Sequence, residues 1–136
     1  MSANKGTIYP AAINFLKHNW PSIFWAAFVL WLSLSPAKGL PHIAIPQFDK
    51  LVHFSFYFIL ASLMYYGWKK QNTLALLHQN PFLKIILIAS LYGLSIEVLQ
   101  ETVTNDRYFS LWDELANILG ALSGLWISRK LFPFKT

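Results

Sequence analysis

Residues 82–100 read FLKIILIASLYGLSIEVLQ, and this stretch decides the fold class. It is apolar for almost its whole length, and its charged side chains are Lys84 near the start and Glu97 near the end. A helix rises about 1.5 Å per residue, so a segment of this length is close to the minimum that crosses a hydrocarbon core of about 30 Å. The stretch is therefore predicted to form a transmembrane helix.

Three further stretches share this apolar character, and each is close to the lower limit of about 17 residues for a membrane span. They cover residues 20–35, 51–68 and 111–128. Strands do not explain them, because apolar and polar residues do not alternate and four short strands cannot close a barrel. The sequence predicts an all-α membrane protein, a four-helix transmembrane up-down bundle joined by short loops.

The flanks of the predicted bundle (residues 20–128) differ in character. Residues 1–19 form a cytoplasmic or interfacial segment, either a short helix on the membrane surface or a disordered tail, and residues 129–136 form a basic cytoplasmic tail. The sequence Ser35-Pro36-Ala37 weakly resembles a signal-peptide cleavage site. The bulky run before it favours a retained first span instead.

The charges divide between the two sides of the predicted membrane. Eight of the eleven basic residues lie on flanks without an acid: Lys5, Lys17, Lys69, Lys70, Lys84, Arg129, Lys130 and Lys135. The other flanks hold Lys38, Lys50 and Arg107 with all six acids, Asp49, Glu97, Glu101, Asp106, Asp113 and Glu114. Basic flanks stay in the cytoplasm. Both termini are therefore predicted to be cytoplasmic, in a multi-pass membrane protein whose acids lie toward the outer face.

Composition excludes several classes of function. Hydrophobic residues make up 55% of the chain and charged residues 12%, which is about half the share in soluble proteins. The absence of cysteine removes disulfides, thiolate nucleophiles and cysteine-bound zinc. The basic residues are scattered around membrane segments and form no continuous patch, so membrane lipid, and not nucleic acid, is the expected partner.

Small and polar residues recur at a spacing of four, which places them on shared helix faces. The second segment carries Asp49, His53, Tyr57 and Ala61; the third carries Ala89, Gly93 and Glu97, with Gln100 to one side; the fourth carries Asp113, Asn117, Gly120 and Gly124. Small residues allow close helix packing in lipid, so Ala89, Gly93, Gly120 and Gly124 are predicted packing positions. The same faces become polar toward the outer end, where the side chains should point into the bundle.

Glu97 is the residue most difficult to explain by structure alone. It lies inside an apolar helix, near a C-terminal end whose dipole disfavours an anion, so its burial requires a partner. Arg107 is the expected partner and Lys50 the second choice. Asp49 and Asp113 have a simpler alternative, because acids in the first turn of a helix complement its dipole, and Ser110 before Asp113 is typical of a helix cap.

The candidate catalytic residues are His53, Glu97 and Asp113. Asp49, one turn before His53, could orient the imidazole for acid–base chemistry, although a hydrogen-bonded structural histidine is an equally simple interpretation. Metal binding is weakly indicated: the oxygen-rich donor set suits a hard cation better than zinc, no HExxH or Asp-rich motif is present, and nearby cations would compete. The sequence therefore predicts no metal and no cofactor. Nucleophile-elbow and phosphate-loop motifs are absent.

Read in order, the polar residues resemble the VanZ-like family of small bacterial membrane proteins. The resemblance covers about residues 48–124 and consists of Asp49, Lys50, His53, Tyr57, Glu97, Gln100, Arg107, Ser110, Asp113, Asn117 and Gly120. It departs from the family at Asn105-Asp106, where a Pro-Gly pair is expected. The family takes its name from a member associated with teicoplanin resistance, and the resemblance implies a four-helix envelope protein with a polar cluster at the outer face.

The leading functional hypothesis is an outer-face pocket that binds or modifies an anionic or glycan-bearing envelope ligand, such as a lipid-linked precursor. The candidate binding residues are Asp49, Lys50, His53, Tyr57, Glu97, Gln100, Arg107, Ser110, Asp113 and Asn117. An enzymatic version of the site, a non-catalytic assembly protein and, last, a small transporter are the alternatives. The sequence leaves the ligand, the catalytic question and the oligomeric state open.

Overall fold

A computed structural model describes residues 8–35, 47–105 and 107–134. These residues form the helices α1 (Ile8–Leu34), α2 (Phe48–Lys70), α3 (Pro81–Val103) and α4 (Leu111–Leu131), with a short 3-10 helix, η1 (Ala75–His78), before α3. No strand occurs in this part of the chain, which confirms the all-helical prediction. The connection between the first two predicted spans, residues 36–50, lies largely outside the described residues.

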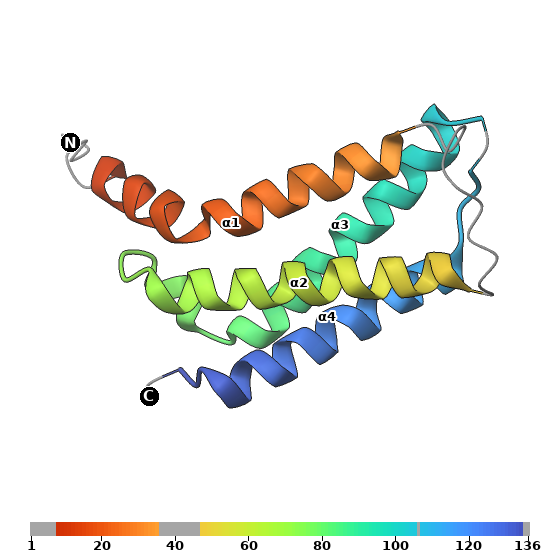
Figure 1. Cartoon of the computed structure of the whole chain (residues 1–136). Helices are drawn as coiled ribbons and strands as arrows, with labels where there is room; N and C mark the ends of the chain where they lie inside the picture. Colours follow the sequence, from red (N-terminus) through yellow and green to blue (C-terminus); the bar gives the residue numbers. More distant parts are fainter. Residues whose placement is uncertain (1–7, 36–46, 106, 135–136) are drawn as a thin grey trace.

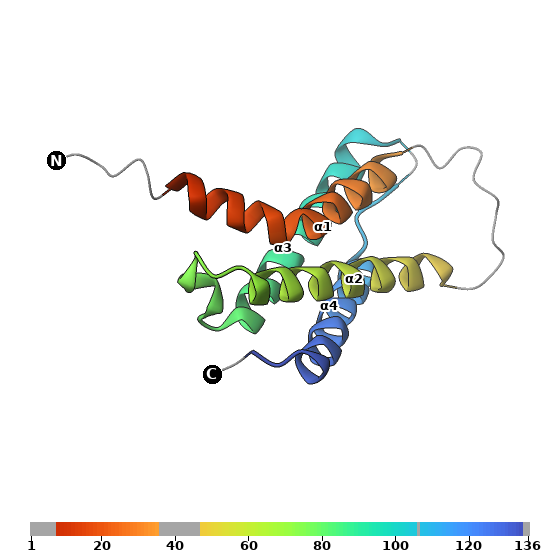
Figure 2. The same ribbon diagram turned by 60° about the vertical axis from the view of Figure 1, so that its left-hand side comes forward.

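Consecutive helices run in opposite directions (Figure 1), so the start of α1 and the end of α4 lie at the same end of the bundle. The starts of α2 and α4 and the end of α3 lie at the other end. Helix α2 is central, because it contacts all three other helices and packs most extensively against α4. Figure 2 shows that α4 is inclined to α2, and α1 contacts α2 and α3 but, within the described ranges, not α4.

The helix boundaries follow local sequence signals. Asn80 precedes Pro81, which is the first residue of α3, and the Ser110 hydroxyl accepts a hydrogen bond from the backbone N–H of Asp113 at the start of α4. The first helix differs from the prediction: residues 8–19 do not form a separate segment but continue directly into the predicted span through Pro21. Helix α1 changes direction partway along its length (Figure 1).

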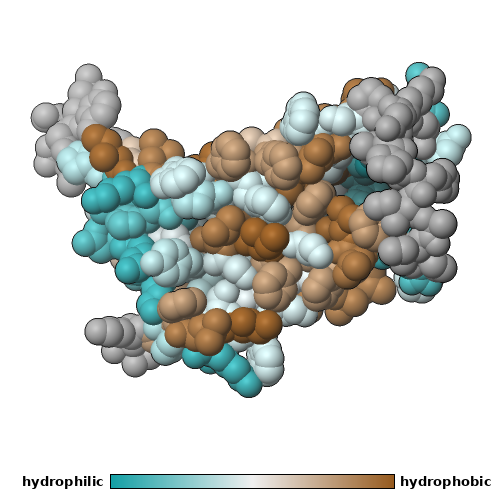
Figure 3. All heavy atoms as spheres, in the orientation of Figure 1, coloured by the Kyte–Doolittle hydropathy of each residue, from teal (hydrophilic) through white to brown (hydrophobic). Residues whose placement is uncertain are grey.

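The bundle has a mixed interior and an apolar exterior. Helix α3 buries Gly93, Glu97 and Gln100, whereas its exposed face presents large apolar residues: Leu83, Leu87, Ile88, Leu91, Leu94 and Val98. Apolar side chains also form a band over the middle of the surface in Figure 3, with hydrophilic residues at one end. This distribution is the reverse of that in a soluble helix and is expected where lipid is the solvent.

Helices α2 and α3 are each long and apolar enough to cross a membrane by length and composition. Helices α1 and α4 do not meet this criterion, because charged and other polar residues lie near the ends of their apolar stretches. The first half of α1 contains Lys17, and α4 has acids in its first turn and basic residues in its last. The structure therefore supports two of the four predicted spans by this criterion and indicates a membrane protein.

Glycines set the distance between α2 and α4. A Cβ atom added to Gly120 would collide with the backbone around the carbonyl of Phe54, and one added to Gly124 would collide with the carbonyl of Phe58. Both glycines are buried. The GxxxG pair thus brings the backbone of α4 directly onto α2, as small residues permit in membrane helices.

Candidate functional site

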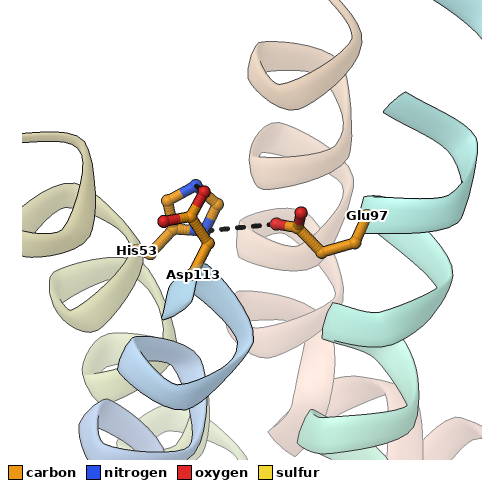
Figure 4. Close-up of side chains that lie close together, drawn as sticks. All are labelled: His53, Glu97 and Asp113. Atoms are coloured by element: carbon orange, nitrogen blue, oxygen red, sulfur yellow. Dashed lines mark ion pairs between the residues drawn. The ribbon is translucent and has the colours of Figure 1, made fainter. Parts of the chain in front are cut away.

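Three polar side chains from three helices meet at the end of the bundle where α2 and α4 begin. His53 of α2, Glu97 of α3 and Asp113 of α4 point toward one another (Figure 4). The His53 Nδ1 lies 3.9 Å from Oε1 of Glu97, and its Nε2 lies 3.9 Å from Oδ2 of Asp113. We call these three residues the charged cluster. Glu97 is 1% exposed, whereas the side chains of His53 and Asp113 are 16% and 15% exposed.

The environment of Glu97 explains how a carboxyl group is accommodated inside the bundle. Its Oε2 accepts a hydrogen bond of 3.2 Å from the backbone N–H of Ser110, immediately before α4. The positive end of the α4 dipole therefore lies beside the carboxyl group and offsets the unfavourable C-terminal end of α3. The other oxygen, Oε1, is buried and has no hydrogen-bond partner among the described residues.

A chain of hydrogen bonds supports His53. The Asn117 side-chain oxygen lies 3.1 Å from His53 Nδ1, and the Asn117 amide Nδ2 donates to Oε2 of Glu114 at 3.1 Å. Because the amide nitrogen faces the carboxylate, the amide oxygen must face the ring, and Nδ1 must then carry a proton to donate. In the neutral ring this leaves the lone pair on Nε2, the nitrogen that faces Asp113.

Lys50 joins two carboxylates at the rim of the charged cluster. Its Nζ lies 3.0 Å from Oδ2 of Asp49 and 3.3 Å from Oδ1 of Asp113. Lys50 therefore does not serve as the second-choice partner of Glu97, as the sequence suggested, but pairs with Asp113. Asp49 is exposed, so its contact with Lys50 contributes little.

Two predicted site residues have different neighbours from those expected. Arg107 interacts electrostatically with Glu97, but the predicted ion pair between the two side chains is absent from the ion pairs found among the described residues. The partner of Glu97 is His53 instead, because the helix start at Ser110 occupies the adjacent position. Gln100 is buried and donates to the carbonyl of Ser33 at 2.9 Å, so it ties α3 to α1 and is not engaged in the charged cluster.

Tyr57 and Gly93 lie one step deeper in the bundle. The Tyr57 hydroxyl is buried without a hydrogen-bond partner in the described part of the chain. A Cβ atom on Gly93 would lie 2.6 Å from Oε2 of Glu114, 2.8 Å from Nδ2 of Asn117 and 3.2 Å from the Tyr57 hydroxyl. Because Gly93 has no side chain, Glu114, Asn117 and Tyr57 can occupy the space beside it.

Glu114 is a residue of the candidate site that the sequence reasoning missed. The sequence places it only among the six acids of the outer side, yet it accepts the hydrogen bond that orients Asn117. The signal was present, because residues three apart on a helix share a face and Glu114 precedes Asn117 by three positions. The structure thus adds a fourth carboxylate to Asp49, Glu97 and Asp113.

The charged cluster combines an imidazole with two carboxylates, which permits acid–base chemistry or cation binding. One potential ligand atom from each of His53, Glu97 and Asp113 lies within 4.8 Å of the others. A cavity of about 500 Å³ lies elsewhere, lined by Phe82, Leu122, Ser123, Trp126 and Ile127, and it is largely apolar. Access to the cluster is instead through the partly exposed sides of His53 and Asp113.

The fold and the site define a small helical membrane protein with a charged cluster at one end of its bundle. The sequence model of the VanZ/LLP1 family matches residues 4–132, nearly the whole chain. The chain therefore belongs to the VanZ/LLP1 family, which confirms the resemblance found in its polar residues. No curated protein and no solved structure matches it.

Proposed function

We propose that this protein is a four-span protein of the bacterial inner membrane whose charged cluster binds an anionic or glycan-bearing envelope ligand at the outer face. The observation that carries this proposal is the convergence of His53, Glu97 and Asp113 at one end of the bundle, with Lys50 and Arg107 close to them. A purely structural role would not require three ionisable groups from three helices to meet at one point. Ionisable groups inside a membrane usually mark a functional site.

The proposed topology rests on the distribution of basic residues. Lys69 and Lys70 end α2, Lys84 lies in the first turn of α3, and Arg129 and Lys130 end α4. These ends lie together (Figure 1), opposite the charged cluster. Basic ends remain cytoplasmic, which assigns the cluster to the outer face and both termini to the cytoplasm.

Single-cysteine labelling tests this topology directly, because the chain contains no cysteine of its own. Glu101→Cys places an exposed thiol near the cluster, and Lys70→Cys places one at the opposite end of α2. A maleimide that cannot cross membranes should label the first variant in intact cells and the second only after lysis. The reverse pattern would contradict the proposed orientation.

Arg107 is the residue proposed to recognise the ligand. Its planar guanidinium can make paired hydrogen bonds to a phosphate or carboxylate, whereas Lys50 is already held between Asp49 and Asp113. A lipid-linked precursor exposes phosphate and sugar hydroxyls at the membrane surface, the depth proposed for this end of the bundle. A link to glycopeptide susceptibility of the teicoplanin type follows, because such antibiotics act on the same precursors.

The test compares Arg107→Ala with Arg129→Ala, a matched loss of one guanidinium at the opposite end of the bundle. We expect Arg107→Ala to change teicoplanin susceptibility and to weaken retention of lipid-linked precursor by the purified protein in nanodiscs. Arg129→Ala should leave both unchanged. Unaltered susceptibility, precursor retention and lipid profile in the Arg107→Ala strain would refute the proposal.

A structural role is the second candidate, and the hydrogen bonds between α2 and α4 favour it. His53 and Asn117 join these helices directly. If the cluster only stabilises the bundle, His53→Ala and Glu97→Gln should lower thermal stability in detergent in proportion to the loss of activity in cells. Loss of activity at unchanged stability would exclude this alternative.

A further inference from the structure

We propose that His53, Glu97 and Asp113 bind one divalent first-row transition-metal ion. The donor set is one imidazole nitrogen and two carboxylate oxygens, with the three ligand atoms within 4.8 Å of one another. Such a mixed set suits Zn²⁺, Mn²⁺, Fe²⁺ or Co²⁺ better than Ca²⁺ or Mg²⁺, which prefer oxygen alone. The inference concerns the same end of the bundle as the proposed function but requires no envelope ligand.

The unsatisfied oxygen of Glu97 is the independent observation that points to a cation. Glu97 is 1% exposed, its Oε1 has no hydrogen-bond partner among the described residues, and the side chain is directed at His53 and Asp113 (Figure 4). Leaving a carboxylate oxygen buried without a partner is costly, because the group has lost water and gained nothing in exchange. A metal ion at this point would supply the missing partner.

The charges around the cluster also favour a cation. Asp49, Glu97, Asp113 and Glu114 contribute four carboxylates, against the cations Lys50, which contacts Asp49 and Asp113, and Arg107, which acts on Glu97 without an ion pair among the described residues. Lys50 does not block the site, because it contacts Oδ1 of Asp113 while Oδ2 faces Nε2 of His53. One carboxylate can therefore hold Lys50 and a metal ion through different oxygens.

The hydrogen bonds of His53 prepare it as a ligand. Asn117 accepts the Nδ1 proton, which leaves the Nε2 lone pair directed at Asp113. Bonds of about 2.0–2.1 Å place two ligand atoms roughly 3.4 Å apart in a tetrahedral site, so the observed 3.9 Å between Nε2 and Oδ2 needs a contraction of about half an ångström. Side-chain rotations are required for this contraction and to bring Oε1 of Glu97, which lies 3.9 Å from Nδ1, toward Nε2. Three protein ligands leave a coordination position open on the partly exposed side.

The experiment uses the full chain in nanodiscs, purified with a histidine-free tag and stripped with a chelator. Cobalt(II) is added alone, and its visible absorption reports both binding and coordination number; zinc(II) is then measured by calorimetry. We expect one ion per chain. Glu97→Gln or Asp113→Asn should weaken binding at least tenfold. Asn117→Ala removes no ligand but takes away the support of His53 and the hydrogen bond to Glu114, and it should weaken binding about 10- to 100-fold. Glu101→Gln, an exposed carboxylate one turn along α3, should bind as wild type.

Absence of cobalt binding at millimolar concentration, or equal binding by wild type and both ligand variants, would overturn the inference. Metal-free melting temperatures show whether each variant is folded. If Glu97→Gln does not fold, the partly exposed Asp113 still tests the site. The two proposals fail separately: metal binding with no effect of Arg107→Ala in cells would remove only the envelope ligand, whereas an Arg107→Ala effect in a protein that binds no metal would remove only the ion.

Discussion

Replacing Gly93 by alanine should disturb the charged cluster without unfolding the bundle. The added methyl would lie 2.6 Å from Oε2 of Glu114 and 2.8 Å from Nδ2 of Asn117, whereas ordinary contact begins at 3.4 Å. The two atoms must therefore retreat by about 0.8 and 0.6 Å. A shift of about 0.6 Å in the Asn117 amide would stretch its 3.1 Å bond to His53 beyond hydrogen-bonding distance.

The energetic cost follows from the two hydrogen bonds of Asn117, to His53 and to Glu114. A side-chain hydrogen bond between membrane helices is worth about 0.6 kcal/mol on average and up to about 1.7 kcal/mol. Losing both costs about 1 to 3 kcal/mol, which corresponds to about a 5- to 140-fold change in the population of the ordered cluster. Alanine also favours a helix over glycine by up to about 1 kcal/mol, which offsets part of the loss in global stability.

The assay is the ¹⁵N spectrum of the histidine rings, with the His53 signal assigned from His53→Ala. In wild type the spectrum should show a proton fixed on Nδ1, and in Gly93→Ala this signal should broaden or shift toward a mixture of tautomers. Gly67→Ala is the control, because its methyl would meet Asn19 at 2.5 Å at the opposite end of α2. The control should lower stability and leave the His53 signal unchanged. An unaltered His53 signal in Gly93→Ala would refute the described packing.

Two further predictions concern the helix contacts. Gly120→Ala forces α4 away from the carbonyl of Phe54 and should lower the free energy of unfolding in detergent by about 1–3 kcal/mol. Leu119→Ala, on the exposed face, should change this free energy by much less. Equal effects of the two substitutions would contradict the contact between Gly120 and Phe54. Gln100→Leu removes the hydrogen bond to the Ser33 carbonyl and should lower the free energy of unfolding by about 1 kcal/mol without changing ligand or metal binding. A loss of binding at unchanged stability would show that Gln100 belongs to the binding site.

Much of the fold could be predicted from the sequence, because lipid imposes simple constraints on it. Apolar segments of sufficient length must form helices, and Asn80-Pro81 and Ser110 provide physical signals for where two of them begin. Helix α1 was predicted less accurately. Its first half contains polar residues that a hydropathy argument assigns to a separate segment, yet the backbone hydrogen bonds continue past Pro21. Hydropathy indicates which part of a helix is expected to face lipid, but it does not determine where the helix begins.

Some residues of the candidate site could also be predicted from the sequence. Four-residue spacing places His53 and Glu97 on interior faces, and it requires only that the helices pack in register. The partner of Glu97 was not predictable, because spacing along one helix does not determine which atom of a neighbour lies opposite. The backbone N–H of Ser110 took the position assigned to Arg107. A backbone donor carries no signal in the sequence, whereas an arginine does.

The buried polar groups at this end of the bundle bear on the choice between a ligand-binding role and a purely structural role. Where a polar group serves only packing, its hydrogen bonds are satisfied within the protein, as for the Gln100 amide that donates to the carbonyl of Ser33. Three buried side-chain atoms lack hydrogen-bond partners in the described part of the chain: Oδ1 of Asn19 at the opposite end of the bundle, Oε1 of Glu97 and the hydroxyl of Tyr57. Oε1 of Glu97 and the Tyr57 hydroxyl have lost their water without gaining a hydrogen bond, a cost that a bundle free to substitute apolar residues need not carry. Glu97 and Tyr57 lie on adjacent helices at or near the charged cluster, where the metal ion or ligand proposed above would supply the missing partner.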